Sequence, residues 1–304
     1  MQKKFGPLIV FLSSLLWAGD APFRKPLLTG GLSVGFVSFL EHIFNVLACL
    51  PGLFRHRLEL KSVNWKQWLG LIYIGAGASA LGAILFVKGA VVMNYNFTVA
   101  ALLQKFQPIF AILLAVIFLK EKLNSKFWLL AIPAFLGGYL VTFGLAAPSV
   151  LWQSGSVNLI GAVLALLAAV LWAGGTVVGR SLLKGLNLQL VNGMRFFFGL
   201  VFLAGYVAVA ESFQFGLMNP LFWRNTIIIA MLTGFFALLL YYYGLKSTKA
   251  SVATLMELGY PLALTVVNWK FLGITLDAWQ IAGTLILLVS VTIFTLSQKE
   301  QELG

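Results

Sequence analysis

The sequence predicts an all-α polytopic membrane protein of ten transmembrane helices, arranged as two inverted five-helix repeats. Of its 304 residues, 60% are hydrophobic and only 10% are charged, whereas soluble proteins carry about 25% charged residues. Many of its apolar runs reach the roughly 20 residues that a helix needs to cross a bilayer. A β-barrel would instead show alternating segments of about ten residues.

Ten apolar runs, separated by short polar connections, are the expected helices. Because the connections are short, we expect successive helices to pack antiparallel. The longest polar breaks are residues 55–67 and the stretch around residues 211–221. The expected spans are residues 5–23, 32–54, 68–87, 97–119, 127–146, 157–178, 188–210, 223–245, 251–272 and 278–296.

The first repeat is expected in residues 1–150 and the second in residues 151–304, with five spans in each. Trp17 in the first span has a counterpart in Trp172 of the sixth, and both are followed by Ala and Gly. Because five is an odd number, the second repeat must enter the membrane from the opposite side. Transporters with inverted repeats hold their substrate near the midplane, where the repeats meet.

The basic residues predict the orientation, because cytoplasmic loops are enriched in Lys and Arg. Most of the 21 Lys and Arg residues fall in segments that share a side with the two termini. We therefore expect a multi-pass protein of the inner (plasma) membrane with both termini cytoplasmic and the first apolar run retained as a helix. The opposite side is expected to hold Arg24, Lys25, Lys88, Arg224 and Lys270.

Residues 98–122 and 251–272 are predicted to form a repeated broken helix. Pro108 and Pro261 hold matching places in these two segments, and each proline removes one backbone hydrogen bond and bends its helix. The freed carbonyl groups either meet the substrate or, as we favour, the bends shape a cavity.

Lys105 and Glu257 lie at similar depth in these two segments, beside the prolines. A charge near the bilayer centre costs about 2.5–3.5 kcal/mol on insertion scales, so both side chains should face a cavity or a partner. We predict that Lys105, next to Gln104, binds a carboxylate or phosphate, and that Glu257 binds an ammonium group or carries a proton. The alternative is an internal ion pair between Lys105 and Glu257 that fastens the two halves.

Five further residues are candidates for substrate binding. Glu41 and Arg195 hold nearly equivalent places in the second span of each repeat. They either bind substrate or pair with each other, and Arg195 could also reach the membrane surface. Trp17, Trp172 and Tyr260 are candidates for stacking on the substrate, with packing or an interfacial position as the alternative.

Two smaller predictions concern neighbouring polar groups. His42 is expected to be a satisfied packing residue, and Asn45 is expected to hydrogen-bond Glu41, since the two share a helix face. Residues 241–243 are three consecutive tyrosines; they are predicted to be mainly interfacial, and the alternative is that one of them faces the cavity.

The chain resembles the EamA-like branch of the drug/metabolite transporter superfamily over its whole length. The resemblance implies transport of small metabolites, often amino-acid-like and often outward, by alternating access. The residues that carry it are Leu16 to Gly19 with their copy at 171–174, then Ala100, Gln104 and Pro108, Leu119 and Glu121, Gly137 and Gly138, Met194 to Phe196, and Glu257 with Pro261.

We therefore predict a secondary transporter that moves a small polar metabolite, an amino acid or a related compound, out of the cell. The alternative substrates are phosphorylated or nucleotide-linked sugars and organic anions. A more distant alternative is a membrane-embedded lipid-modifying enzyme, but the sequence lacks the clustered acids and histidines of such enzymes. We expect no enzymatic activity.

The sequence also indicates which cofactors and binding partners to expect. It has no phosphate-binding loop, dinucleotide fingerprint, metal-ligand spacing or nucleophile motif, so no cofactor or metal is expected. Its net charge of +12 is spread between apolar runs, which argues against nucleic acid. The expected partners are a small-molecule substrate and the lipid bilayer, with a coupling proton and a second copy of the chain also considered.

Overall fold

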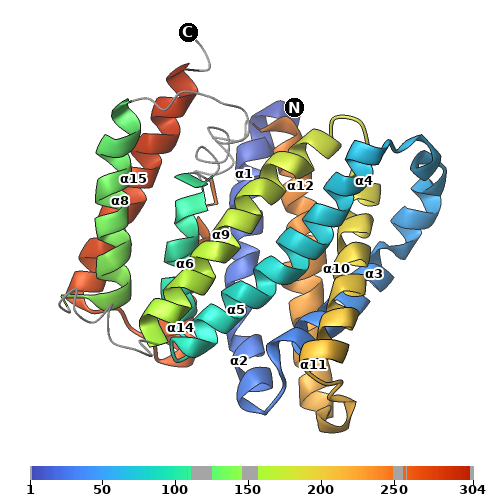
Figure 1. Cartoon of the computed structure of the whole chain (residues 1–304), viewed down its shortest axis with the longest axis horizontal. Coiled ribbons are helices and arrows are strands. Elements are labelled where there is room, and N and C mark those ends of the chain that lie inside the picture. Colours follow the sequence, from blue (N-terminus) through green and yellow to red (C-terminus); the bar gives the residue numbers. More distant parts are fainter. Residues whose placement is uncertain are drawn as a thin grey trace.

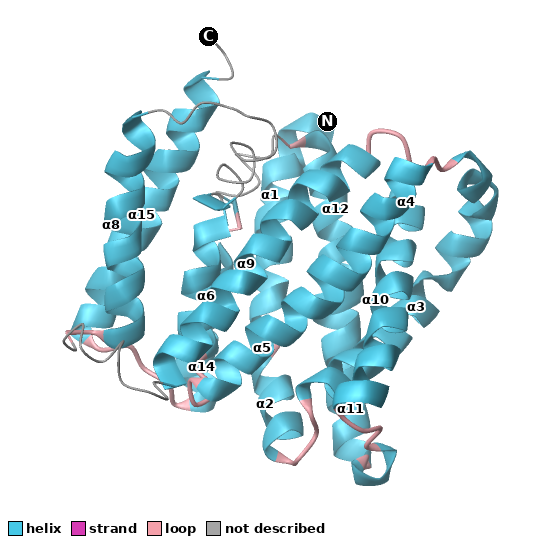
Figure 2. Cartoon of the chain, in the orientation of Figure 1, coloured by secondary structure: helices cyan, strands magenta, loops and turns pink. Residues whose placement is uncertain are grey.

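The structure is a computed structural model that describes residues 2–107, 109–110, 125–145, 157–248, 256–257 and 259–301. Within these residues the chain is helical and contains no strand (Figure 2). The helices form one elongated bundle, and α1 begins and α15 ends at the same end of it (Figure 1). Predictions that concern Pro108, residues 120–122 and residues 251–255 lie outside the described residues.

The first half of the chain contains helices α1 to α8. Several of them begin at a polar cap: the Ser33 side chain accepts a hydrogen bond from the Phe36 N–H, and Asn64 forms a capping box with Gln67. Such caps satisfy backbone N–H groups that a helix start leaves free. The elements are α1 (Gln2–Ala18), α2 (Ala21–Thr29), α3 (Val34–His56), η1 (Arg57–Ser62), α4 (Trp65–Ile72), η2 (Tyr73–Leu81), α5 (Gly82–Val92), α6 (Phe97–Leu103), η3 (Gln104–Phe106) and α8 (Ser125–Phe143).

The second half repeats this order. Asn187 caps α10 and Asn219 caps α11 in the same way as the caps of the first half. The elements are α9 (Val157–Leu182), α10 (Leu188–Ala210), η5 (Phe215–Leu217), α11 (Pro220–Ile229), η6 (Ala230–Phe236), α12 (Ala237–Ser247), α14 (Gly259–Leu272) and α15 (Ala278–Gln301).

The helices have the length and composition of a multi-pass membrane protein. Among the described residues, six helical stretches of 23 to 29 residues are apolar enough to cross a bilayer, and three shorter apolar helices accompany them. The predicted class of fold is therefore confirmed, while the predicted number of ten spans stays a prediction. The six are Phe5–Thr29, Val34–Ser62, Trp65–Val92, Asn158–Leu182, Leu188–Ala210 and Pro220–Ser247.

The first span differs from the prediction, which ended it at residue 23 and placed Arg24 in an outer loop. The chain bends at Asp20 and then continues as α2 to Thr29. Pro22 is tolerated because it lies in the first turn of α2, whereas Pro26 lies inside this short helix. Arg24 is consequently a buried residue, only 6% exposed.

The two halves pack across each other in matching ways. Helix α1 contacts α12 and α14, whereas α9 contacts α5 and α6. A Cβ placed on Gly89 in α5 would lie 2.8 Å from the carbonyl oxygen of Gly161 in α9. A Cβ on Gly244 in α12 would lie 2.9 Å from the carbonyl oxygen of Gly6 in α1. Helices α1 and α9 run in opposite directions, so these contacts lie at opposite ends of the bundle (Figure 1), as expected of inverted repeats.

Each half also has a π-helical segment in its third long helix: η2 continues α4 into α5, and η6 continues α11 into α12. A π-helical turn widens the helix and commonly marks a functional site. Both segments contribute to the same internal cavity, η2 through Ala78 and Ser79 and η6 through Thr233 and Gly234. The repeat therefore extends to a backbone irregularity that the sequence did not predict.

Helices α8 and α15 close one side of the bundle (Figure 1). They approach each other closely: a Cβ on Gly137 would lie 2.8 Å from the carbonyl oxygen of Gly283. A Cβ on Gly283 would likewise lie 2.8 Å from the carbonyl oxygen of Gly137. Small residues are what such a close helix crossing requires.

Candidate functional site

A cavity of about 240 Å³ lies where the two halves meet. Its walls come from α1, α2, α3, η2 and α5 of the first half and from α9, α10, η6 and α12 of the second. Two helix breaks also contribute, one at η3 and the other at the turn around Glu257 before α14. Among the predicted site residues, those that line it are Trp17, Glu41, Gln104, Trp172, Arg195, Glu257 and Tyr260. Lys105 is not among the lining residues.

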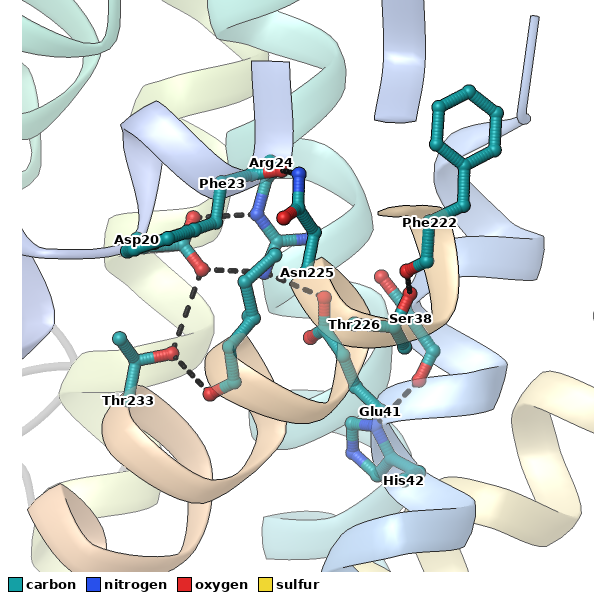
Figure 3. A network of polar contacts seen from close by, with 11 residues as sticks. Asp20, Phe23, Arg24, Ser38, Glu41, His42, Phe222, Asn225, Thr226 and Thr233 are labelled. Atoms are coloured by element: carbon teal, nitrogen blue, oxygen red, sulfur yellow. Dashed lines mark hydrogen bonds and ion pairs between the residues drawn. The ribbon is translucent and has the colours of Figure 1, made fainter. Parts of the chain in front are cut away.

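A network of charged and polar side chains (Figure 3) contributes residues to the cavity lining. The Arg24 guanidinium contacts both oxygens of Asp20, at 2.5 and 2.8 Å, and Oε1 of Glu41 at 2.7 Å. Thr233 donates a hydrogen bond to Asp20 at 3.4 Å. Two carboxylates thus share one cation, and buried ions are tolerated only when they are paired in this way.

The network corrects one prediction and adds residues that were missed. Glu41 pairs with Arg24, so the predicted alternative of a pair between Glu41 and Arg195 is wrong. Arg24 was overlooked because it was assigned to a loop. The spacing between Asp20 and Arg24, which suits an ion pair along a helix, is the signal that could have found it.

Lys105 and Glu257 are neighbours, as predicted, but their charged groups do not meet. The Lys105 ammonium donates a 3.0 Å hydrogen bond to the main-chain oxygen of Glu257. Although both residues belong to the described part of the chain, no ion pair joins their side chains. The helix breaks at both residues, at η3 on one side and at the turn before α14 on the other.

The Glu257 carboxylate has a different partner. It accepts a 2.8 Å hydrogen bond from the Tyr241 hydroxyl. The Tyr241 ring lies against Trp17, with centroids 5.3 Å apart, and the ring of Tyr260 meets Trp17 edge-on at 6.4 Å. One carboxylate and three aromatic rings therefore form one wall of the cavity.

Arg195 lines the cavity beside the tyrosines of α12. Its Nη1 donates a 2.8 Å hydrogen bond to the Tyr242 hydroxyl, and its guanidinium lies 5.9 Å from the centre of the Tyr242 ring. Its Nε is buried without a hydrogen-bond partner. Tyr241 and Tyr242 both line the cavity, whereas Tyr243 is 45% exposed. The prediction of a mainly interfacial role is therefore wrong for Tyr241 and Tyr242.

The matching tryptophans differ in their contacts. The indole N–H of Trp172 donates a 2.7 Å hydrogen bond to the main-chain oxygen of Ala78 in η2. Its ring packs against Phe86 at 5.3 Å. Gly82 makes room for it, because a Cβ there would lie 2.8 Å from the indole nitrogen. Trp172, which belongs to the second half, is therefore held by residues of the first half. Trp17, which belongs to the first half, packs against rings of the second half.

The remaining polar residues of the cavity are amides, hydroxyls and one histidine. Gln107, buried, donates a 3.1 Å hydrogen bond to Thr176, and the Oε1 of Gln104 is buried without a partner. His42 contacts the Ser38 carbonyl at 2.8 Å and the Ser79 hydroxyl at 3.1 Å. Both ring nitrogens of His42 therefore have partners, as predicted, although the residue also lines the cavity.

Two other observations bear on the predictions. The predicted hydrogen bond from the Asn45 amide to Glu41 is not among the hydrogen bonds of the described residues. The Oδ1 of Asn45 is buried without a hydrogen-bond partner, as is the Oε1 of Glu41 apart from its ion pair with Arg24. Within the described residues, no group of His, Cys, Asp and Glu side chains is arranged to hold a metal ion. The chemistry that the cavity offers is therefore stacking, hydrogen bonding and charge.

Comparisons with known proteins agree with this architecture. The family model described as the EamA-like transporter family matches residues 4–143 and 159–296. A protein of Fusobacterium nucleatum named riboflavin transporter ImpX is 33% identical over 292 residues, covering 94% of this chain and 96% of that protein. A protein of Bacillus subtilis named uncharacterized transporter YvbV is 26% identical over 301 residues, covering 97% and 92%. A crystal structure that is 15% identical in sequence superposes with a TM-score of 0.67 over 98% of this chain and 99% of that one.

Proposed function

Because this chain belongs to the EamA-like transporter family, and is thus a multi-pass membrane transporter, we propose that it carries riboflavin or a closely related flavin. The transported molecule would bind in the cavity between the two halves. Transport would proceed by alternating access, in which the matching contacts of the two halves open and close in turn. The comparisons lend no support to the amino-acid substrate that the sequence suggested.

One observation carries the proposal: the cavity has aromatic walls with polar groups set among them, and a relative with 33% identity is named for riboflavin. The flavin ring system is flat, and stacking between aromatic groups contributes about 0.5–1.5 kcal/mol beyond the area that they bury. Trp17, Tyr241 and Tyr260 form a continuous aromatic wall on which such a ring could stack.

The polar groups complement the other parts of a flavin. Its outer ring presents one N–H between two carbonyl oxygens, and an amide side chain can match this edge by accepting and donating at once. Gln104 and Gln107 both line the cavity, and the Oε1 of Gln104 still lacks a partner. The hydroxyl groups of the ribityl chain are donors for the carboxylates of Glu41 and Glu257.

A second candidate substrate is an organic anion, and Arg195 is the observation that favours it. Arg24 is neutralised by two carboxylates, whereas Arg195 is bonded to the Tyr242 hydroxyl and forms no ion pair among the described residues. A phosphorylated flavin would combine both candidates.

Binding and transport by the purified protein test the proposal. Riboflavin fluorescence should be quenched on binding, and proteoliposomes should move labelled riboflavin in competition with flavin mononucleotide but not with amino acids. Loading the label inside or outside the vesicles tests the predicted outward direction. Absence of riboflavin binding, together with thermal stabilisation by an amino acid, would overturn the proposal.

A further inference from the structure

We infer that Lys105 is a positioning residue. Its bond to the main chain of Glu257, at the turn before α14, keeps Glu257 and Tyr260 facing the cavity, and Lys105 itself does not touch the transported molecule. The inference rests on the proposed transport site, since it assigns a role within that site. It replaces the expectation that Lys105 itself binds the anionic group of a substrate.

The position of Lys105 supports this role. The side chain is only 3% exposed and lies outside the cavity lining, although Gln104 and Gln107 on either side contribute to it. The ammonium group is 3.0 Å from the main-chain oxygen of Glu257 and 5.7 Å from the centre of the Tyr260 ring. Lys105 therefore contacts two residues that line the cavity without lining it itself.

The main-chain carbonyl group of Glu257 can accept the bond from Lys105 because it lacks its usual helical donor. In an α-helix the carbonyl of Glu257 would accept from the N–H of the residue four positions later, which is Pro261. Proline has no N–H, so the Glu257 oxygen accepts instead from the N–H of Tyr260, at 3.1 Å. A carbonyl oxygen has two lone pairs, and the Lys105 ammonium fills the remaining place with a charge-assisted bond.

The bond from Lys105 leaves the side chain of Glu257 free to contact other groups. Because the ammonium is bonded to the main chain, the Glu257 carboxylate stays on the cavity side, where the Tyr241 hydroxyl donates to it at 2.8 Å. The buried cation still lies near this carboxylate and lowers the cost of burying it. Lys105 and Glu257 come from opposite halves of the chain, so the bond also joins the two helix breaks across their interface.

Hydrogen exchange on the full-length protein tests the inference without any ligand. In Lys105→Met, backbone exchange around Glu257 and Tyr260 should rise at least about tenfold, the effect of losing one charge-assisted hydrogen bond. Lys105→Arg should restore protection, because its guanidinium reaches the same oxygen. Lys88→Met is the matched control, since Lys88 is a lysine of α5 bonded to Tyr206 outside the cavity.

Flavin binding is the second readout. Lys105→Met should weaken the binding of riboflavin and of flavin mononucleotide by the same factor. This loss of affinity should largely disappear in a Glu257→Gln background, because Lys105 acts through that residue. A selective loss of the phosphorylated flavin, equal in both backgrounds, would instead make Lys105 a ligand and overturn the inference. So would unchanged exchange at Glu257 and Tyr260 in Lys105→Met.

The outcomes also separate this inference from the proposed function. If exchange changes as expected but no flavin binds to the unaltered protein, the positioning role holds and the flavin proposal fails. If Lys105→Met is not recovered in folded form, Lys105→Gln replaces it. The Gln amide is uncharged and one bond shorter than the Lys ammonium, so the same increase in exchange is expected, and its absence counts against the inference.

Discussion

The indole N–H of Trp172 donates a 2.7 Å hydrogen bond to the main-chain oxygen of Ala78, which binds the second half of the chain to the π-helical segment of the first. The matching Trp17 instead contacts the rings of Tyr241 and Tyr260. Two residues in equivalent places thus have different roles in this conformation. Trp172 anchors one wall of the cavity, and Trp17 is the ring on which the proposed ligand would stack.

A pair of Trp-to-Phe variants tests this difference. Trp172→Phe keeps an aromatic ring but leaves the Ala78 carbonyl without its donor, so we expect a loss of stability of about 1 kcal/mol. Trp17→Phe should leave stability nearly unchanged and weaken riboflavin binding several-fold. Thermal unfolding and flavin fluorescence quenching measure the two effects. Equal changes in both properties for both variants would contradict the assignment.

Removal of Arg24 should destabilise the protein strongly. Arg24→Met leaves Asp20 and Glu41, whose side chains are only 17% and 12% exposed, without their cation, and breaking a buried ion pair costs about 3–5 kcal/mol. Thermal unfolding in detergent measures the loss. Arg224→Met is the matched control, because Arg224 is exposed. An Arg24→Met protein as stable as the control would show that the network is not structurally required.

The glycine contacts at the two ends of the bundle should not tolerate a methyl group. Gly89→Ala and Gly244→Ala each place a Cβ within 3 Å of a facing carbonyl oxygen, and overpacking of this kind costs about 1–3 kcal/mol. We expect lower thermal stability and slower flavin transport in both variants. Gly205→Ala is the control, because a Cβ there meets nothing within 4 Å and Ala favours a helix.

Arg195 should distinguish the two candidate substrates. In Arg195→Gln the guanidinium beside Tyr242 is lost, so an anionic ligand loses its charge partner while a neutral one loses at most a hydrogen bond. We expect flavin mononucleotide binding to weaken more than riboflavin binding. Isothermal titration of both ligands against the variant measures this. Equal losses would remove Arg195 as an anion site and leave riboflavin as the better candidate.

Sequence reasoning identified the class of fold and much of the cavity lining. Trp17, Trp172, Glu257 and Tyr260 were found because their signals are local: a repeated motif, a charge within an apolar run, or an aromatic residue beside a proline. The cost of burying a charge in a membrane is a property of each side chain. A sequence pattern can therefore predict that such a residue needs a cavity or a partner.

The sequence by itself determined that long apolar helices occur in two related sets, because hydrophobic length and repeated motifs are properties of the chain in order. Only the tertiary structure decided which charged groups meet. Glu41 is bonded to Arg24 rather than to Arg195, and Lys105 is bonded to a carbonyl oxygen of Glu257 rather than to its carboxylate. The physical reason is that hydrogen bonds and ion pairs depend on distances of about 3 Å between atoms, and helix packing sets those distances across parts of the chain that are far apart in sequence.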